Sequence, residues 1–287
     1  MKNICTLSDI NYLLYGITLY ESLKSTTENF VLHYLCLDSE TYNSLVRLEC
    51  ESLKIYHIDS FTDSDKSLKS LKESEYKYFC WSLASYFTNY LLKISSVKDI
   101  MYIDSDIYMY NNLDVIYSEI GDRDVGIFRH RQFPLDIVRD EGFYNVGLVY
   151  FKNSDIGKSV SGWWTDAVIN KKYPHYATCG DQKYLDHFPK MCNKNEIYID
   201  ENIGHGAPWL WQLYEFLEDG KIKWGDEIQD LVFTHFSQFR LTDSGYIPST
   251  MHHIYTPMHM YVQNTKLKRI YDEYYNQLVF NKNKYNL

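Results

Sequence analysis

The sequence has little positive charge, and this limits the partners that it can have. Its 287 residues include 29 Lys and Arg against 38 Asp and Glu, which gives a formal net charge of −9. Binding to the phosphates of nucleic acids needs an excess of cations, so we expect no nucleic-acid partner. With 45% hydrophobic and 23% charged residues, the composition is typical of a globular chain that can bury one sizeable core.

Pairs of cysteines with CxxC spacing are also missing. Of the six cysteines, no two have CxxC spacing, and Cys5, Cys36 and Cys80 lie within apolar runs. This pattern fits a reduced, cytoplasmic setting best.

Long apolar runs are absent as well. No run of about 18 apolar residues occurs, so we expect no segment that crosses a membrane. Near the N-terminus, Ser8, Asp9 and Asn11 interrupt the apolar residues, so we expect no signal peptide.

The chain does contain short β-rich runs that alternate with helical patterns. The expected strands are Asn3–Leu7, Phe30–Leu37, Lys54–Ile58, Asp99–Ile103, Asp124–Arg129, Asn145–Lys152, Glu196–Ile199 and Leu231–His235. The expected helices are Tyr12–Ser25, Ser39–Ser52, Tyr76–Lys93, Ser154–Ile169, Asp181–Phe188 and Leu267–Val279. Such alternation favours an α/β fold with a mainly parallel sheet. The most polar stretch, Asp59–Ser74, predicts a mobile loop.

A polar loop, "TLSDIN", follows the first expected strand. Ligands of open α/β sheets sit at the carboxyl ends of strands. The loop is therefore placed where a nucleotide could rest, with Asp9 and Asn11 offering polar contacts. The alternative is that one of these two side chains caps the helix that follows.

Two carboxylates follow a buried strand in "DIMYIDSDIYMYNNLD", which runs from Asp99 to Asp114. Residues two apart in extended chain point to the same face, so Asp104 and Asp106 should project together. Two like charges so close repel each other, and a divalent cation with oxygen ligands removes that conflict. A metal that holds phosphate is thus one interpretation, and a turn after a strand is the other.

A histidine ends another apolar run in "DLVFTHFSQFR". The neutral imidazole of His235 could complete a site of two carboxylates and one imidazole, which suits Mn²⁺ better than Mg²⁺. The alternative is a structural histidine after a strand.

Five segments in a fixed order resemble a known family. "CTLSDINYLLYGITLYESL", "MYIDSDIYMYNNLD", "YNVGLVYFKN", "GDQKYLDHFP" and "VFTHFSQFR" are similar to segments of bacterial GT-A-fold glycosyltransferases, in the retaining group that includes glycogenin and the lipopolysaccharide galactosyl- and glucosyltransferases. The likeness runs from Cys5 to about Arg240. It implies a Rossmann-like α/β fold, with a mixed, mainly parallel sheet flanked by helices. We expect a glycosyltransferase domain over residues 1–265 and a basic, aromatic helix and tail over 266–287.

The resemblance also implies ligands for the donor. Asp104 and Asp106 match the acids that bind the metal, with Ser105 between them at the donor, and His235 matches the histidine that completes the metal site. Thr6, Asp9 and Tyr12 match positions that hold the nucleoside. His205, in "GHGAPWLW", lies beside two glycines where it could contact the diphosphate.

The same likeness implies three residues beside the reacting sugar. Asn145 of "YNVG" matches a polar side chain that faces the donor sugar, and Asp181 and Gln182 of "GDQ" match the pair beside the anomeric carbon. The alternative, from the sequence pattern alone, is that Asn145 caps a turn and that Asp181 caps a helix. Trp209 and Trp211 could stack on acceptor sugars or simply fill space.

The implied activity is metal-dependent transfer of a hexose from a nucleotide-diphosphate sugar, UDP-linked by expectation, to a glycan, lipid-linked glycan or protein hydroxyl, as in polysaccharide biosynthesis. The implied cofactor is Mn²⁺ or Mg²⁺, and the implied stereochemistry is retention. Alternatives are a silent sugar-nucleotide-binding protein and an effector that glycosylates a host protein. A nucleotidyltransferase is disfavoured because no Gly-rich loop with Lys or Arg lies near the N-terminus.

Cations for the donor phosphates are scarce. Relatives often carry a basic residue on the helix before the two acids, and a glycine and lysine after the histidine. Here the candidates are Lys77, Arg129 and Arg131, with Ser237 and Arg240 after the histidine.

The C-terminal segment mixes lysines and arginine with aromatic residues. Such a helix could rest on the anionic inner face of a membrane, and the alternative is a helix packed on the body of the protein.

Overall fold

The computed structural model describes residues 1–48, 50–131, 140–218 and 220–287. These residues form two compact units. Unit 1 contains residues Met1–Asn11, Asn29–Asp104 and Ile120–Glu201, and unit 2 contains Tyr12–Glu28, Ser105–Glu119 and Asn202–Leu287.

Unit 1 is built on one seven-stranded sheet with the strand order β3-β2-β1-β4-β7-β6-β8. Its strands are β1 (Lys2–Ser8), β2 (Phe30–Cys36), β3 (Leu53–His57), β4 (Asp99–Ile103), β6 (Val125–Arg129), β7 (Tyr144–Lys152) and β8 (Ile197–Ile199). Only β7 is antiparallel to its neighbours, and the other pairs are parallel. The predicted mixed, mainly parallel sheet is therefore confirmed, and all eight expected strands correspond to a strand of the structure.

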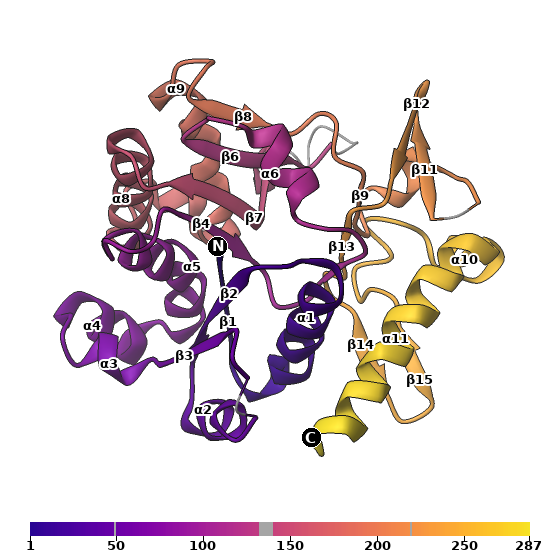
Figure 1. Cartoon of the computed structure of the whole chain (residues 1–287), viewed down its shortest axis with the longest axis horizontal. Coiled ribbons are helices and arrows are strands. Elements are labelled where there is room, and N and C mark those ends of the chain that lie inside the picture. The colour runs from indigo at the N-terminus through magenta and orange to yellow at the C-terminus, as the bar shows by residue number, and fades with distance from the viewer. Residues whose placement is uncertain (49, 132–139, 219) are drawn as a thin grey trace. The chain divides into compact units, whose positions relative to one another are not determined.

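Helices cover this sheet in Figure 1. They are α2 (Ser39–Val46), α3 (Asp59–Thr62), α4 (Lys66–Ser74), α5 (Tyr76–Leu92), α8 (Asp155–Ile169) and α9 (Phe188–Met191), with 3₁₀ turns over Pro174–Cys179 and Gln182–His187. Helices α5 and α8 bury Phe79, Phe87 and Trp164 with Phe151 of β7 in one core cluster. Burying such large apolar side chains is the main stabilising contribution.

The expected loop over Asp59–Ser74 is wrong, because the structure has helices α3 and α4 there. The Asp65 side chain accepts hydrogen bonds from the backbone N–H groups of Ser67 and Leu68, which caps the start of α4. Leu68 and Leu71 lie three residues apart and are both buried. A short apolar stripe hidden among lysines and serines therefore forms a packed helix.

Two other helices differ from expectation. The helix expected over Ser39–Ser52 ends at Val46. The one expected over Asp181–Phe188 is a 3₁₀ turn, Gln182–His187, followed by α9.

Unit 2 combines helices with three small sheets. The helices are α1 (Leu13–Thr26), α6 (Asp114–Ile120), α10 (Met258–Gln263) and α11 (Thr265–Tyr285), with a 3₁₀ turn at Trp211–Leu213, and a further 3₁₀ turn, Ile10–Tyr12, precedes α1. One sheet joins β5 (Ile107–Met109), β13 (Phe233–His235) and β9 (His205–Gly206). The others join β10 (Glu215–Phe216), β11 (Lys221–Trp224) and β12 (Glu227–Asp230), and β14 (Arg240–Thr242) with β15 (Gly245–Ile247).

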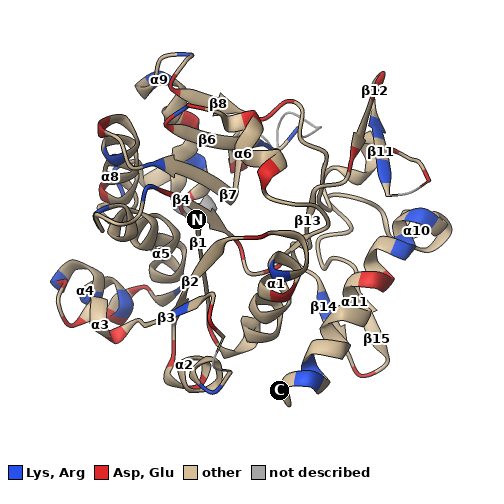
Figure 2. Cartoon of the chain, in the orientation of Figure 1, with Lys and Arg blue, Asp and Glu red and all other residues tan. Residues whose placement is uncertain are grey.

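Helix α11 packs with one face inside unit 2. Its residues Leu267, Tyr271, Tyr274 and Leu278 are buried in the aromatic core of the unit, and Asn281 donates a hydrogen bond to Thr18 of α1 at 3.0 Å. Figure 2 shows basic residues near both ends of the helix and acidic residues between them. The packed alternative for this helix is thus observed, and contact with a membrane stays a prediction.

The domain boundary expected at residues 265 and 266 also stays a prediction.

Among the helices that the structure describes, none is long and apolar enough to pass through a bilayer.

Candidate metal and donor site

The first carboxylate of the predicted metal site lies at the end of β4. The strand continues its pairing by one residue, because the Asp104 backbone N–H donates to the carbonyl oxygen of Gly147 at 2.9 Å. The Tyr102 hydroxyl donates to Oδ1 of Asp104 at 2.6 Å. The buried apolar residues of β4 and this hydrogen bond fix the direction of the carboxylate.

The second carboxylate and the histidine lie on paired strands of unit 2. Strands β5 and β13 are antiparallel, with His235 opposite Ile107, and Phe236 N–H donates to the Asp106 carbonyl oxygen at 2.9 Å. Nε2 of His235 lies 3.1 Å from Oδ1 of Asp106, and the two side chains are 9% and 15% exposed. The Trp209 ring meets the imidazole edge to face at 5.4 Å.

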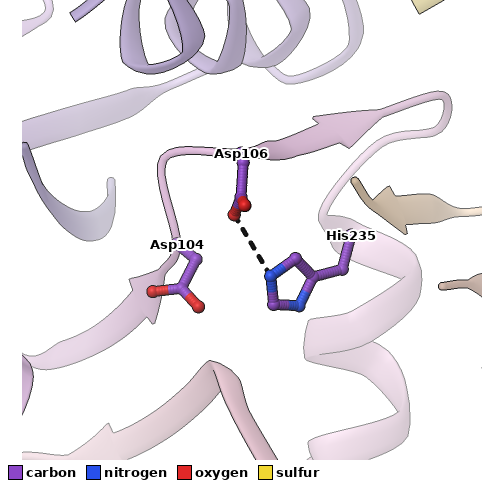
Figure 3. A group of neighbouring side chains, drawn as sticks. All are labelled: Asp104, Asp106 and His235. Carbon is purple, nitrogen blue, oxygen red and sulfur yellow. Dashed lines mark ion pairs between the residues drawn. The ribbon is translucent and has the colours of Figure 1, made fainter. Parts of the chain in front are cut away.

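Asp104, Asp106 and His235 come together as a group that could hold a metal ion. Only Ser105 separates the two carboxylates, so the chain itself keeps them near each other. One ligand atom from each of the three residues lies within 4.8 Å of the others, and Figure 3 shows the three side chains. Two carboxylates and one imidazole fit a divalent cation such as Mn²⁺. The sequence predicted this juxtaposition, and the role as metal ligands stays a prediction.

Asn145 and Gln182 form one fixed amide cluster in unit 1. Nδ2 of Asn145 donates to Oε1 of Gln182 at 3.0 Å, and Nε2 of Gln182 donates to the Glu141 carbonyl oxygen at 3.0 Å. The sequence analysis missed His130, which is 2% exposed and whose Nε2 lies 3.2 Å from Nδ2 of Asn145. Its Nδ1 lies 2.9 Å from the Gly142 carbonyl oxygen. A neutral ring that donates from Nδ1 and accepts at Nε2 satisfies both contacts.

Asp181 is a buried carboxyl group. Its side chain is 5% exposed, and Oδ2 has no hydrogen-bond partner among the described residues. Burial, and secondly the charge of Asp104, raise the pKa of Asp181 well above its usual range. Gly180 before it has φ +61°, and a Cβ there would lie 2.8 Å from the Trp81 ring. Only glycine therefore lets the chain turn closely enough to direct Asp181 inward.

The residues expected to hold the nucleoside occupy different settings. Thr6 of β1 is fully buried in unit 1, and its hydroxyl has no partner among the described residues. Asp9 follows the strand and accepts a hydrogen bond from Asn11 at 3.1 Å. No side chain caps the start of α1, so the capping alternative is not observed. In unit 2 the Tyr12 hydroxyl accepts from Arg240 at 2.8 Å.

The aromatic segment around His205 serves mainly packing. The imidazole stacks on Phe233 with ring centres 5.2 Å apart, and its Nδ1 lies 3.1 Å from the Ile203 carbonyl oxygen. Trp211 is fully buried and donates to the Tyr271 hydroxyl at 3.0 Å, so it belongs to the core. A Cβ on Gly206 would lie 2.0 Å from the Trp211 ring, which requires glycine there. The contact of His205 with a diphosphate stays a prediction.

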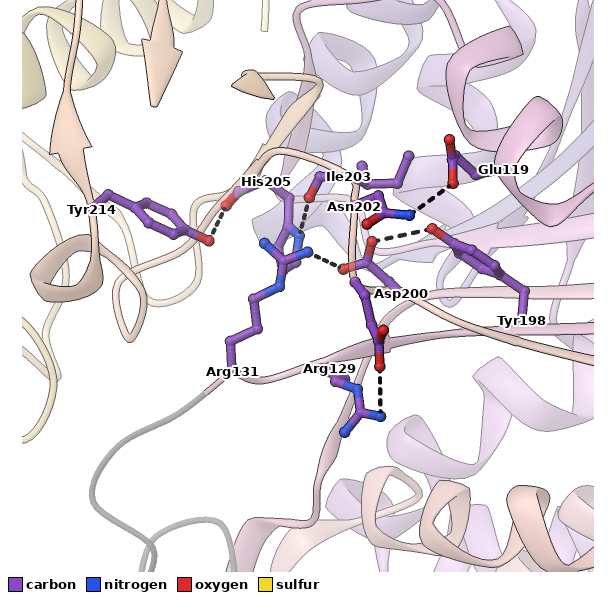
Figure 4. A network of polar contacts seen from close by, with 10 residues as sticks. Glu119, Arg129, Arg131, Tyr198, Asp200, Asn202, Ile203, His205 and Tyr214 are labelled. Atoms are coloured by element: carbon purple, nitrogen blue, oxygen red, sulfur yellow. Dashed lines mark hydrogen bonds and ion pairs between the residues drawn. The ribbon is translucent and has the colours of Figure 1, made fainter. Parts of the chain in front are cut away.

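The candidate cations are engaged by other side chains. Arg131 forms a fully buried ion pair of 2.6 Å with Asp200, which Tyr198 also contacts at 3.3 Å (Figure 4). Arg129 lies 3.2 Å from Glu201 on the surface.

Lys77 lies 4.6 Å from the centre of the Trp81 ring. Arg240 donates from Nη1 to the Tyr12 hydroxyl at 2.8 Å and to the Phe239 carbonyl oxygen at 3.4 Å.

No protein-family model matches the sequence. A Bacillus subtilis (strain 168) protein described as uncharacterized protein YfnF is 26% identical over 254 residues, which cover 83% of this chain and 81% of that protein. Among solved structures, mouse xyloside xylosyltransferase 1 in its apo form has a TM-score of 0.55 at 12% identity, over 82% of this chain and 97% of that one.

The galactosyltransferase LgtC, solved with donor and acceptor sugar analogs, has a TM-score of 0.49 at 14% identity, over 81% of this chain and 86% of that one. The likeness to the xylosyltransferase shows the fold. The predicted resemblance to GT-A glycosyltransferases is therefore confirmed for the fold.

Proposed function

We propose that this chain is a metal-dependent glycosyltransferase that moves a hexose from a UDP-sugar to a hydroxyl group of a glycan, with retention at the anomeric carbon. The observation that carries the proposal is the group of Asp104, Asp106 and His235 directly after the central strand β4, in a chain with a glycosyltransferase fold.

The two carboxylates and the imidazole are the proposed metal ligands. The side chains of Asp106 and His235 are in contact and largely shielded from water. The hydrogen bond from the Tyr102 hydroxyl orients the carboxylate of Asp104. A divalent cation held there, Mn²⁺ or Mg²⁺, supplies Lewis-acid stabilisation of the charge on a leaving diphosphate. Since the candidate cations Arg129 and Arg131 are paired with acids, the divalent cation that these three side chains would hold is the main means of balancing the phosphate charge.

The amide cluster of unit 1 is proposed to face the donor sugar. Positive charge develops on the sugar ring as the bond to the diphosphate breaks, and oriented amide and carboxyl oxygens stabilise it. The amides of Asn145 and Gln182 are held by mutual and backbone hydrogen bonds, so they need little reorganisation. Thr6, Asp9 and Tyr12 are proposed for the nucleoside, and Ser105 and His205 for the diphosphate.

We propose that retention proceeds by attack on the front face of the sugar, and not by a double displacement with Asp181 as the nucleophile. In front-face attack the bond from the anomeric carbon to the phosphate oxygen breaks, the bond to the acceptor oxygen forms on the same face, and the hydroxyl proton passes to the leaving phosphate. A double displacement needs an ionised carboxylate as nucleophile. Burial raises the pKa of Asp181 and favours the neutral acid, which is a poor nucleophile.

A thermal-shift screen tests this proposal. The full chain is heated with UDP, ADP, GDP and their glucose conjugates, each with Mn²⁺ or with EDTA. A ligand at 100 times its Kd stabilises the folded state by about 2.7 kcal/mol, so we expect a rise of several degrees with one base only, and only with metal. The variant Asp106→Ala should lose the metal-dependent part, and Asp122→Ala, an exposed acid on the surface, should keep it.

Two outcomes count against the proposal. Equal shifts with Mn²⁺ and EDTA contradict metal-dependent binding, and no shift with any nucleotide contradicts the donor assignment. Metal-dependent binding without any release of UDP from a UDP-sugar favours the silent sugar-nucleotide-binding alternative.

A further inference from the structure

Unit 2 contains a groove that the proposed transfer does not use. It has a volume of about 560 Å³ and lies between the β14–β15 hairpin and helices α10 and α11. The wall combines tyrosines with residues that carry hydrogen-bonding groups, and those used below are Ser244, Tyr246, Lys268, Asp272, Tyr275 and Asn276.

Two tyrosine rings form one side of this groove. Tyr246 is stacked on Phe239 with ring centres 5.2 Å apart, and its ring lies 5.3 Å from that of Tyr275. The Tyr246 hydroxyl donates to Oδ1 of Asp272 at 2.6 Å, which fixes the ring. Both tyrosines are only partly buried, so both rings present apolar surface to the groove.

The polar groups offer donors and acceptors without net charge. Lys268 donates to Oδ2 of Asp272 at 2.5 Å, so the two opposite charges are paired. Each carboxylate oxygen keeps a second lone pair, and the ammonium keeps two further N–H groups. The hydroxyl of Ser244 and the amide of Asn276 are exposed and have no hydrogen-bond partner among residues 1–48, 50–131, 140–218 and 220–287.

We propose that this groove binds an uncharged saccharide. A pyranose ring has an apolar face of C–H groups that can pack on tyrosine rings, and hydroxyl groups that both donate and accept at its edge. A strongly charged ligand has no counter-charge here, because Lys268 and Asp272 cancel each other. A fully apolar ligand would cover the Ser244 and Asn276 side chains without replacing their hydrogen bonds to water, which is costly.

The role of the groove rests on the proposed function. If the chain transfers a sugar to a glycan, the groove holds a part of that glycan which lies away from the reacting hydroxyl. Pockets that bind small ligands generally combine aromatic walls with a few placed polar groups, and this groove has that composition.

The test is saturation-transfer NMR on the full chain with three probes: maltose, cellobiose and lactose. EDTA is present and no nucleotide is added, so the metal and donor residues take no part. We expect a transfer signal from at least one disaccharide and a Kd that Tyr275→Ala weakens by about threefold to tenfold, the range for loss of one aromatic contact. Tyr275→Phe, which keeps the ring, should bind nearly as the wild type does.

Phe280→Ala is the matched control. Phe280 is another exposed aromatic residue of α11, 59% exposed, and does not line the groove. Its removal should leave the Kd unchanged. No signal from any of the three disaccharides, or a Kd that Tyr275→Ala and Phe280→Ala change equally, overturns the proposal. Binding of an apolar dye that depends on Tyr275 while no disaccharide binds overturns it too, because the occupant is then apolar.

Release of UDP from UDP-glucose and UDP-galactose, measured in the same variants with Mn²⁺, separates this proposal from the function. Tyr275→Ala should leave the hydrolysis rate unchanged, since hydrolysis needs no glycan. Disaccharide binding without hydrolysis would reject the glycosyltransferase and keep the groove. Hydrolysis without disaccharide binding would do the reverse.

Discussion

The two units of this protein are assembled in opposite ways. Unit 1 surrounds a seven-stranded sheet in which β2 is buried at all seven positions, and β1, β2 and β3 are neighbours both in sequence and in space. Both units gather three stretches of chain, but unit 2 arranges its own, Tyr12–Glu28, Ser105–Glu119 and Asn202–Leu287, around sheets of two or three short strands. Hydrogen bonds along the strands of one large sheet therefore hold unit 1 together, whereas unit 2 depends more on contacts between side chains.

In unit 2, contacts between aromatic rings supply packing that the large sheet supplies in unit 1. Phe236 and Tyr274 stack with ring centres 3.7 Å apart, and Tyr271 meets Phe236 edge to face at 5.1 Å. The strands β5, β9 and β13 have two or three residues each, too few for stability without such packing. Rings from the far end of the chain, those of Tyr271 and Tyr274, therefore help to hold Asp106 and His235 in place through β5 and β13.

The largest expected effect comes from removing the proposed metal ligands. Asp106→Ala or His235→Ala should reduce UDP release from a UDP-sugar by at least about 1,000-fold, because charge stabilisation of several kcal/mol is lost. Both variants should keep the wild-type far-UV circular dichroism. Asp122→Ala, an exposed acid, is the control and should retain full activity. Normal activity in both ligand variants would refute the metal assignment.

The next effect tests whether the rings hold unit 2 together. Phe236→Ala removes a fully buried ring and should lower the free energy of unfolding by about 3–5 kcal/mol. Phe280→Ala removes an aromatic residue that is 59% exposed, and it should change stability by less than about 0.5 kcal/mol. Urea unfolding followed by tryptophan fluorescence measures both. A loss below about 1 kcal/mol for Phe236→Ala would show that the ring cluster is dispensable.

A buried histidine gives unit 1 a dependence on pH. Nδ1 of His33 lies 3.0 Å from the Tyr56 hydroxyl and Nε2 lies 3.4 Å from Oδ1 of Asn3. Burial, and secondly the charge of Lys54, lower the pKa of His33 from 6.5 to about 4. Between these values the unfolded chain binds a proton that the folded chain does not. Stability should therefore fall as the pH drops from 6.5 to 4, by about 3 kcal/mol from this group.

The variant His33→Gln keeps a neutral hydrogen-bonding side chain but cannot take up the proton. We expect its free energy of unfolding, measured by urea titration at several pH values, to fall less between pH 6.5 and pH 4 than that of the wild type. Parallel curves for the two proteins would mean that His33 is not the source.

The smallest effect concerns the capped helix α4 of unit 1. Asp65→Ala removes the acceptor for two backbone N–H groups and should cost about 1 kcal/mol. Asp63→Ala, two residues earlier and exposed, serves as the control and should be nearly neutral. Equal effects of the two substitutions in chemical denaturation would argue against the cap.

The longer strands were predictable from the sequence, and the shortest strands were not. The apolar run that predicted Asp99–Ile103 matches β4 residue for residue. Strands such as β5 and β9, with three and two residues, give no period that a pattern could reveal. The segment with α3 and α4 was mistaken for a loop because its buried residues are few and its surface is rich in lysine and serine.

In the candidate site, too, features that depend on local spacing were predictable, and contacts between distant residues were not. The spacing of Asp104 and Asp106 was informative because two residues apart in extended chain means one face. His130 carried no such signal, since only the folding of β6 against β7 and the segment after it brings its ring to Asn145. The engagement of Arg131 by Asp200, 69 residues away, was likewise hidden.

The sequence by itself determined the α/β sheet, the two acids after β4 and the histidine after an apolar run, because these depend on periodicity and spacing along a short stretch of chain. The tertiary structure alone decided that Nε2 of His235 lies 3.1 Å from Asp106, that Asp181 is buried, and that tyrosines from β15 and α11 line one groove. Contacts between residues far apart in the chain depend on how whole elements pack, and no local pattern encodes that packing.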